Sequence, residues 1–179
     1  MYLCLLLPVI YSSIVCVLSA QTNLHFIFTN HTDISNDEYI ELNCSQTSNF
    51  LLNYDINLKK TLRSVYLQIS IKEYFEKRTT FKFDKTVSVC ELTKARRMNP
   101  VIQVILDVFS KHSNFKLQCV VPAGYYFLKN FGFASDQAQF LRSFIRADTT
   151  WKVSLNYSEK LRMGSVGFLY INHEGYFYK

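Results

Sequence analysis

The chain has 179 residues, of which 49% are hydrophobic and 16% aromatic, and its formal net charge is +6. This composition excludes an intrinsically disordered chain and favours one packed domain. A net positive charge can attract anionic membranes, acidic glycans or nucleic acid, but basic residues dispersed along a sequence are typical of a solvated surface.

The first twenty residues are typical of a secretory signal peptide. Residues 1–20 contain no Lys, Arg, Asp or Glu, and Ser19 and Ala20 provide small residues for cleavage. The alternative is a membrane anchor, but the polar residues 11–13 interrupt the apolar stretch that a spanning helix needs. We therefore expect a secreted, extracellular protein with residues 21–179 as a single domain, no transmembrane segment in the mature chain and no nucleic-acid partner.

Three cysteines follow the expected signal peptide: Cys44, Cys90 and Cys119. In an oxidising compartment one pair is expected to form, which leaves one cysteine over. A bridge from Cys90 to Cys119 would close a loop of about 30 residues, for which the chain-entropy model gives roughly 3 to 4 kcal/mol. Cys44 would then be a free thiol, either buried or shielded by a glycan, or a link to a second chain.

Three Asn-X-Ser/Thr sequons begin at Asn30, Asn43 and Asn156, and these are candidate N-glycosylation sites. The central residue of the second sequon is Cys44. Use of that sequon therefore depends on the accessibility of Cys44.

The first half of the chain predicts several β-strands. Residues 24–28 are apolar and β-prone, and the polar run 30–38 then predicts a loop. Residues 39–44 alternate weakly, residues 45–49 predict a turn, and residues 50–58 predict another strand.

The clearest strand covers residues 63–75. Its apolar residues recur with a period of two, which places one face in the core: Val65, Leu67, Ile69 and Ile71. The charged run 72–78 predicts a hairpin connection, and residues 81–90 predict the partner strand.

One helix is predicted from Asn99 and Pro100, because Asn can cap a helix and Pro suits its first position. Apolar residues then recur at helical spacing up to Phe109, and the helix should end at about 110–112, where Lys111 and His112 suit its carboxyl end. Later strands are predicted over residues 125–133, 151–157 and 163–171. The total is seven to nine strands.

No motif indicates catalysis, a cofactor or a metal. The four histidines lie in dissimilar contexts: they are His25, His31, His112 and His173. The sequence has no HExxH motif, no closely spaced cysteine pair and no Gly-rich phosphate loop. We expect a protein that is not an enzyme.

Aromatic residues recur at Phe81, Phe83, Tyr125–Phe127, Phe131, Phe133, Phe140 and Phe144. Core packing is the simpler interpretation of these residues, and an apolar ligand pocket between two sheets is the alternative. The sequence alone identifies no ligand-binding residues.

Several segments together resemble an insect family of small secreted proteins: Val87–Cys90, Asn99–Pro100, His112–Asn114, Cys119 with Pro122, and Gly124–Asn130. That family is a domain of unknown function that includes the CheB-type chemosensory proteins, and it is similar to the ML lipid-recognition fold. The resemblance extends from about Phe26 to the last strand. It implies an immunoglobulin-like antiparallel β-sandwich whose two sheets can part to admit a lipid or a hydrophobic semiochemical.

The chain departs from that family at two places. Many relatives carry a cysteine near Asp33 as the partner of Cys44, whereas this chain has none, which supports an unpaired Cys44. The proline that usually follows the second central cysteine is delayed here to Pro122.

These observations predict a secreted, non-catalytic carrier or binder of a lipid or small hydrophobic ligand, with chemosensation as one setting. The alternative is an extracellular partner-binding or receptor-binding protein with a closed core and no small-molecule ligand.

Overall fold

The computed structural model describes residues 25–132, 146 and 148–178. The expected signal peptide and three of the aromatic residues, Phe133, Phe140 and Phe144, lie outside the described residues. The elements in chain order are β1 (His25–Ser35), β2 (Ile40–Ser48), β3 (Leu51–Leu58), β4 (Val65–Phe75), β5 (Arg78–Ser88), the 3-10 helix η2 (Val89–Glu91), α2 (Leu92–Met98), α3 (Pro100–His112), β6 (Gly124–Phe131), β7 (Thr150–Leu161) and β8 (Gly164–Tyr178).

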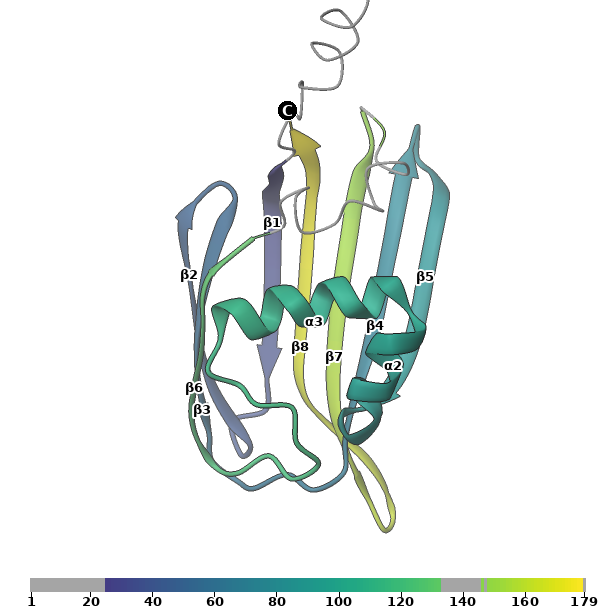
Figure 1. Cartoon of the computed structure of the whole chain (residues 1–179). Coiled ribbons are helices and arrows are strands. Elements are labelled where there is room, and N and C mark those ends of the chain that lie inside the picture. The colour runs from purple at the N-terminus through teal and green to yellow at the C-terminus, as the bar shows by residue number, and fades with distance from the viewer. Residues whose placement is uncertain (1–24, 133–145, 147, 179) are drawn as a thin grey trace, which may run out of the picture.

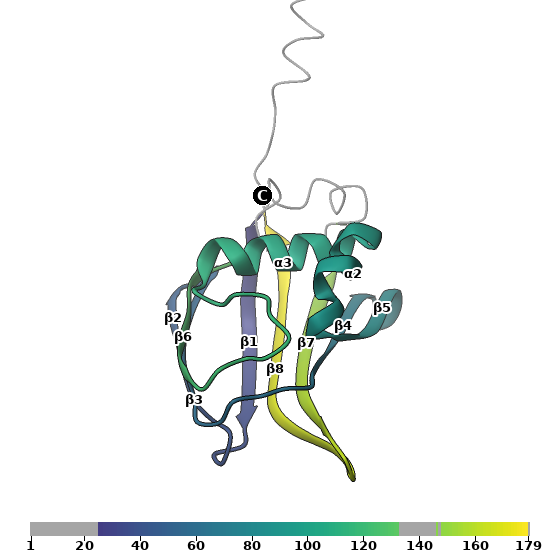
Figure 2. The same ribbon diagram turned by 60° about the horizontal axis from the view of Figure 1, so that its bottom comes forward.

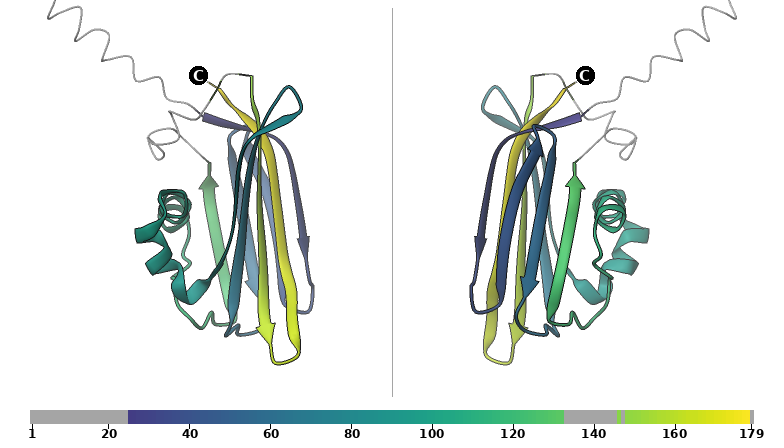
Figure 3. Two further views of the ribbon diagram at one scale, coloured as in Figure 1. Left: turned by 90° about the vertical axis from the view of Figure 1, so that its right-hand side faces the viewer. Right: turned by 90° about the vertical axis from the view of Figure 1, so that its left-hand side faces the viewer.

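The strands form two antiparallel sheets, which confirms the predicted β-sandwich. The larger sheet has the order β1-β8-β7-β4-β5, and the smaller has the order β2-β3-β6. Figure 1 shows the smaller sheet on the β1 side and α3 crossing in front of β8, β7 and β4. In Figure 3 the helices lie on one side of the larger sheet. Among the described residues, no helix is long and apolar enough to cross a bilayer.

Strand β4 has the predicted period of two. Val65, Leu67 and Ile69 are buried, and the residues between them are only half-buried. Its neighbour β7 repeats the pattern with Trp151, Val153 and Leu155. Side chains two positions apart on a strand share a face, so the alternation places one face of the central strands in the core.

Two polar segments were wrongly predicted as a loop and a turn. Residues 30–35 continue β1 by pairing with residues 169–174 of β8, and residues 45–48 continue β2 by pairing with β3. Both strands lie at sheet edges, where outward side chains face solvent, so a polar composition does not interrupt the backbone ladder.

The connection between β4 and β5 is tighter than the charged run predicts. Glu76 and Lys77 have φ values of 47° and 65°, and Phe75 pairs directly with Arg78. Positive φ at both central residues is typical of a two-residue turn whose twist matches that of the flanking strands.

Helix α3 confirms the predicted start and end. The side chain of Asn99 accepts hydrogen bonds from the backbone N–H groups of Val101 and Ile102, at 3.0 Å and 3.2 Å. At the other end, the imidazole of His112 donates a hydrogen bond from Nδ1 to the carbonyl oxygen of Lys129, 3.1 Å away. The cap fixes one end of the helix, and the His112 contact ties the other end to β6.

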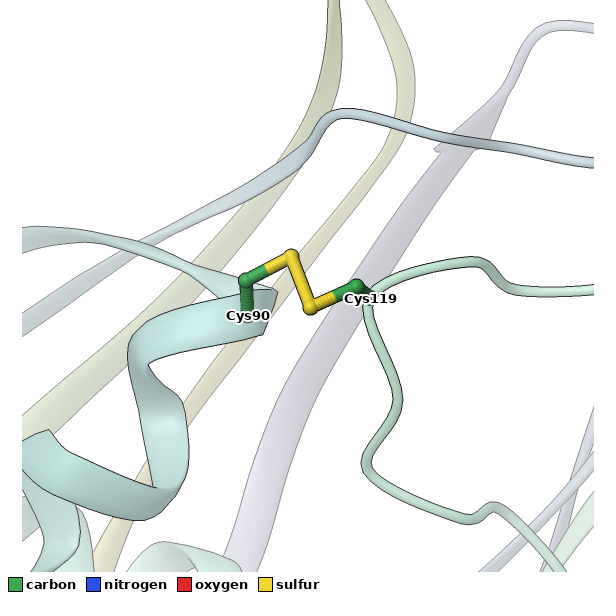
Figure 4. The surroundings of a disulfide bond; sticks show 2 residues. All are labelled: Cys90 and Cys119. Carbon is green, nitrogen blue, oxygen red and sulfur yellow. A yellow bond between two sulfur atoms is a disulfide. The ribbon is translucent and has the colours of Figure 1, made fainter.

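A disulfide joins Cys90 to Cys119, as predicted (Figure 4). It ties η2 to the coil that precedes β6. The same coil is held to Leu62 by two backbone hydrogen bonds with Val121, both 2.8 Å long. Elements η2 and α2, which the sequence did not predict, therefore lie in a segment that is anchored at both ends.

We expect loss of this disulfide to lower the free energy of unfolding by about 2–5 kcal/mol. Both cysteines are exposed, so Cys90→Ser with Cys119→Ser should act mainly through the unfolded chain. Urea denaturation monitored by circular dichroism measures the change. Cys44→Ser, which replaces the cysteine outside the bridge, is the control. An unchanged urea midpoint for the double variant would contradict this expectation.

Candidate functional site: an apolar cavity between the sheets

A cavity of about 120 Å³ lies between the two sheets and α3. One water molecule needs only about 10–15 Å³ of such space. The core therefore has room for a group much larger than water.

The cavity walls come from all three layers of the fold. The larger sheet contributes apolar side chains of β4, β7 and β8, which include Leu67, Leu155, Leu169 and Ile171. The smaller sheet contributes side chains of β3 and β6, which include Ile56, Leu58 and Leu128. Helix α3 closes the remaining side with Ile105 and Leu106. Strand residues two positions apart share a face, so the same periodicity that builds the core also lines the cavity.

The coil over residues 113–123 borders the cavity between α3 and β6. Figure 2 shows this coil looping across the face of the molecule. Phe115 and Leu117 line the cavity, and the ring of Phe115 packs against that of Tyr126 at a centroid distance of 5.7 Å. The side chain of Asn114 accepts a hydrogen bond from the backbone N–H of Phe127, 2.8 Å away. The coil is thus fastened to β6 while it presents apolar side chains to the cavity.

One buried histidine interrupts the apolar lining. His173 on β8 is 1% exposed, and its Nε2 atom lies 3.2 Å from the hydroxyl of Tyr54 on β3. Its Nδ1 atom finds no hydrogen-bond partner among the described residues. Burial, with a smaller contribution from His31, lowers the pKa of His173 to about 4, so the ring is neutral at pH 7. A neutral imidazole at the cavity wall can donate or accept one further hydrogen bond.

Tyr54 lies next to both His173 and Cys44. Cys44 is the residue opposite it on β2. Burial raises the pKa of the Tyr54 hydroxyl and that of the Cys44 thiol, so both groups are neutral at pH 7. Cys44 forms no disulfide with another described cysteine, in agreement with the predicted free thiol.

The other residues that the sequence singled out lie at different places in the fold. Asn30, Asn43 and Asn156 are all exposed, as glycosylation would require. His25 is exposed, and His112 ends α3.

The aromatic residues divide between the cavity and the rest of the fold. Tyr126 and Phe131 line the cavity, whereas Phe81 packs against Trp151 away from it and Tyr125 is exposed. Sequence reasoning did not single out His173, although the period of two from Leu169 through Ile171 places it on the inner face of β8.

The fold and the site together define the class of protein: a β-sandwich with an apolar cavity between its sheets. Residues 65–153 match the model of a family described as a protein of unknown function, DUF1091, which supports a place for the chain in a domain family of unknown function. The match includes both bridged cysteines and α3 but not β1, β2, β3 or β8. No curated protein and no solved structure matches the chain.

We expect His173 to make the fold less stable at mildly acidic pH. The unfolded chain takes up a proton at this residue below pH 6.5, whereas the folded protein does so only at about pH 4. The free energy of unfolding should therefore fall as the pH drops from 6.5 toward 4, by up to about 3 kcal/mol from this residue. His173→Leu should remove that component, and urea denaturation at several pH values measures it.

The matched control is His25→Leu, which alters an exposed histidine on β1. The loss of stability that His173 causes in acid should persist in this variant. An equally steep loss of stability in His173→Leu would show that other groups cause the acid sensitivity.

Proposed function

We propose that the protein is a secreted, non-catalytic carrier or binder of a small hydrophobic ligand. The observation that carries the proposal is the apolar cavity between the two sheets and α3. Empty space in a core costs stability because the lining atoms lose their contacts. A ligand that fills the space restores those contacts. The resemblance to CheB-type proteins suggests chemosensation as the setting.

The single buried imidazole favours a ligand with one polar group. An unpartnered buried ring nitrogen costs about 1–3 kcal/mol, and a hydroxyl or a protonated carboxyl group could pair with Nδ1 of His173 in either tautomer. The remaining lining is almost entirely apolar and suits a hydrocarbon chain. A long-chain alcohol or fatty acid has both features.

The expected affinity is moderate. Burying about 300 Å² of apolar ligand surface supplies roughly 7 kcal/mol before the cost of association. This value is compatible with micromolar dissociation constants. Binding would involve no covalent step.

We expect the secreted protein to bind a long-chain alcohol more tightly than the alkane of equal length. Ile56→Trp, which places a large ring at the cavity wall, should weaken both ligands. His173→Leu should weaken only the alcohol, by roughly 2- to 10-fold, because one neutral hydrogen bond is worth about 0.5–1.5 kcal/mol. Displacement of a fluorescent N-phenyl-naphthylamine probe measures both affinities.

Met163→Trp serves as the control, because Met163 is fully exposed at the β7–β8 turn. Organic extraction and native mass spectrometry of the secreted protein test for a ligand that is already bound. If no lipid is released and neither probe ligand binds, the closed-core protein that binds an extracellular partner or receptor becomes the better explanation.

A further inference from the structure

We propose that His31, Asp33 and Cys44 form a Zn²⁺ site at the rim of the sandwich. The three side chains come from β1 and β2, which belong to different sheets. The proposed site does not depend on the carrier function.

The strand geometry brings the three donor atoms together. His31 and Asp33 are two positions apart on β1, so their side chains share one face of that strand. Cys44 lies on β2, in the smaller sheet. One ligand atom from each residue lies within 4.8 Å of the other two, and Nε2 of His31 is 3.6 Å from Oδ1 of Asp33. This is the one such group of three that the described residues contain.

These three ligand types and their spacing suit zinc. Zn²⁺ binds imidazole nitrogen and carboxylate oxygen at about 2.0–2.2 Å and thiolate sulfur at about 2.3 Å, which gives ligand separations of about 3.3–3.6 Å in a tetrahedron. The His31–Asp33 distance of 3.6 Å already fits this spacing. Cys44 needs to approach by about 1 Å at most, within reach of a side-chain rotation.

The surroundings favour a cation and leave room for a fourth ligand. The side chains of His31 and Asp33 are 34% and 28% exposed, so an ion can enter from solvent and keep a water molecule. Asp33 places a carboxylate beside the sulfur of Cys44, and a divalent cation would bind to both groups at once. On binding, the thiol of Cys44 releases its proton to solvent and the thiolate bonds to zinc.

Tyr54 on β3 lies directly opposite Cys44 on β2. Residues that surround a metal site in this way orient the atoms that bind the ion. Zinc at this position would cross-link β1 to β2 and shield the free thiol from oxidation.

The test uses the full secreted protein, stripped with a chelator and then titrated with Zn²⁺. Native mass spectrometry should show one zinc ion per chain. Titration with Co²⁺ should produce the thiolate-to-cobalt charge-transfer band, which Zn²⁺ then abolishes. Bound Zn²⁺ should also slow alkylation of Cys44 by iodoacetamide.

Variants separate this site from incidental metal binding. Loss of an outer contact costs about 10–100-fold in metal affinity, so removal of a direct ligand by His31→Ala or Cys44→Ser should cost more than about 100-fold. His25→Ala removes an exposed histidine from the same strand and should leave the affinity unchanged.

Circular dichroism and an intact Cys90–Cys119 bridge establish that each variant is folded. If Cys44→Ser does not fold, His31→Ala and the alkylation of wild-type Cys44 still decide the question. The proposal is overturned if the folded wild type binds no zinc, if zinc leaves the alkylation rate unchanged, or if His31→Ala binds as tightly as the wild type.

Discussion

The mismatch in width between the two sheets is the constraint on which the rest of the structure depends. A three-stranded sheet cannot cover the inner face of a five-stranded one, and the uncovered strands carry buried apolar residues. Helix α3 supplies the missing cover by crossing β8, β7 and β4 (Figure 1). Because a helix and a sheet edge do not interlock as two matched sheets do, the cavity remains where the three layers meet.

The disulfide helps to hold α3 in this arrangement. The bridge from Cys90 to Cys119 encloses α2 and α3, and the Asn99 cap and the His112 contact fix the ends of α3 within it. Apolar burial alone would hold α3 less firmly, because the cavity removes part of its packing partner. The disulfide thus helps the fold to remain stable with a cavity in its core.

A line of polar side chains runs from the cavity to the rim of the sandwich. His173 at the cavity wall contacts Tyr54, Tyr54 lies opposite Cys44, and Cys44 lies beside Asp33 and His31 at the rim. Tyr54 therefore lies between the two proposed sites. A ligand at His173 and an ion at Cys44 would both have Tyr54 as a neighbour.

The sequence by itself determined the elements whose signals are local. The period of two in β4 and the Asn-Pro start of α3 depend on neighbouring residues, so both were predicted. Residues 30–35 were not, because an edge strand takes its backbone partners from β8 about 140 positions away. Only the tertiary structure decided that His173 faces a cavity, since the cavity walls come from strands remote in sequence. Only the tertiary structure decided that His31 and Asp33 meet Cys44, since β1 and β2 follow each other in sequence but belong to different sheets.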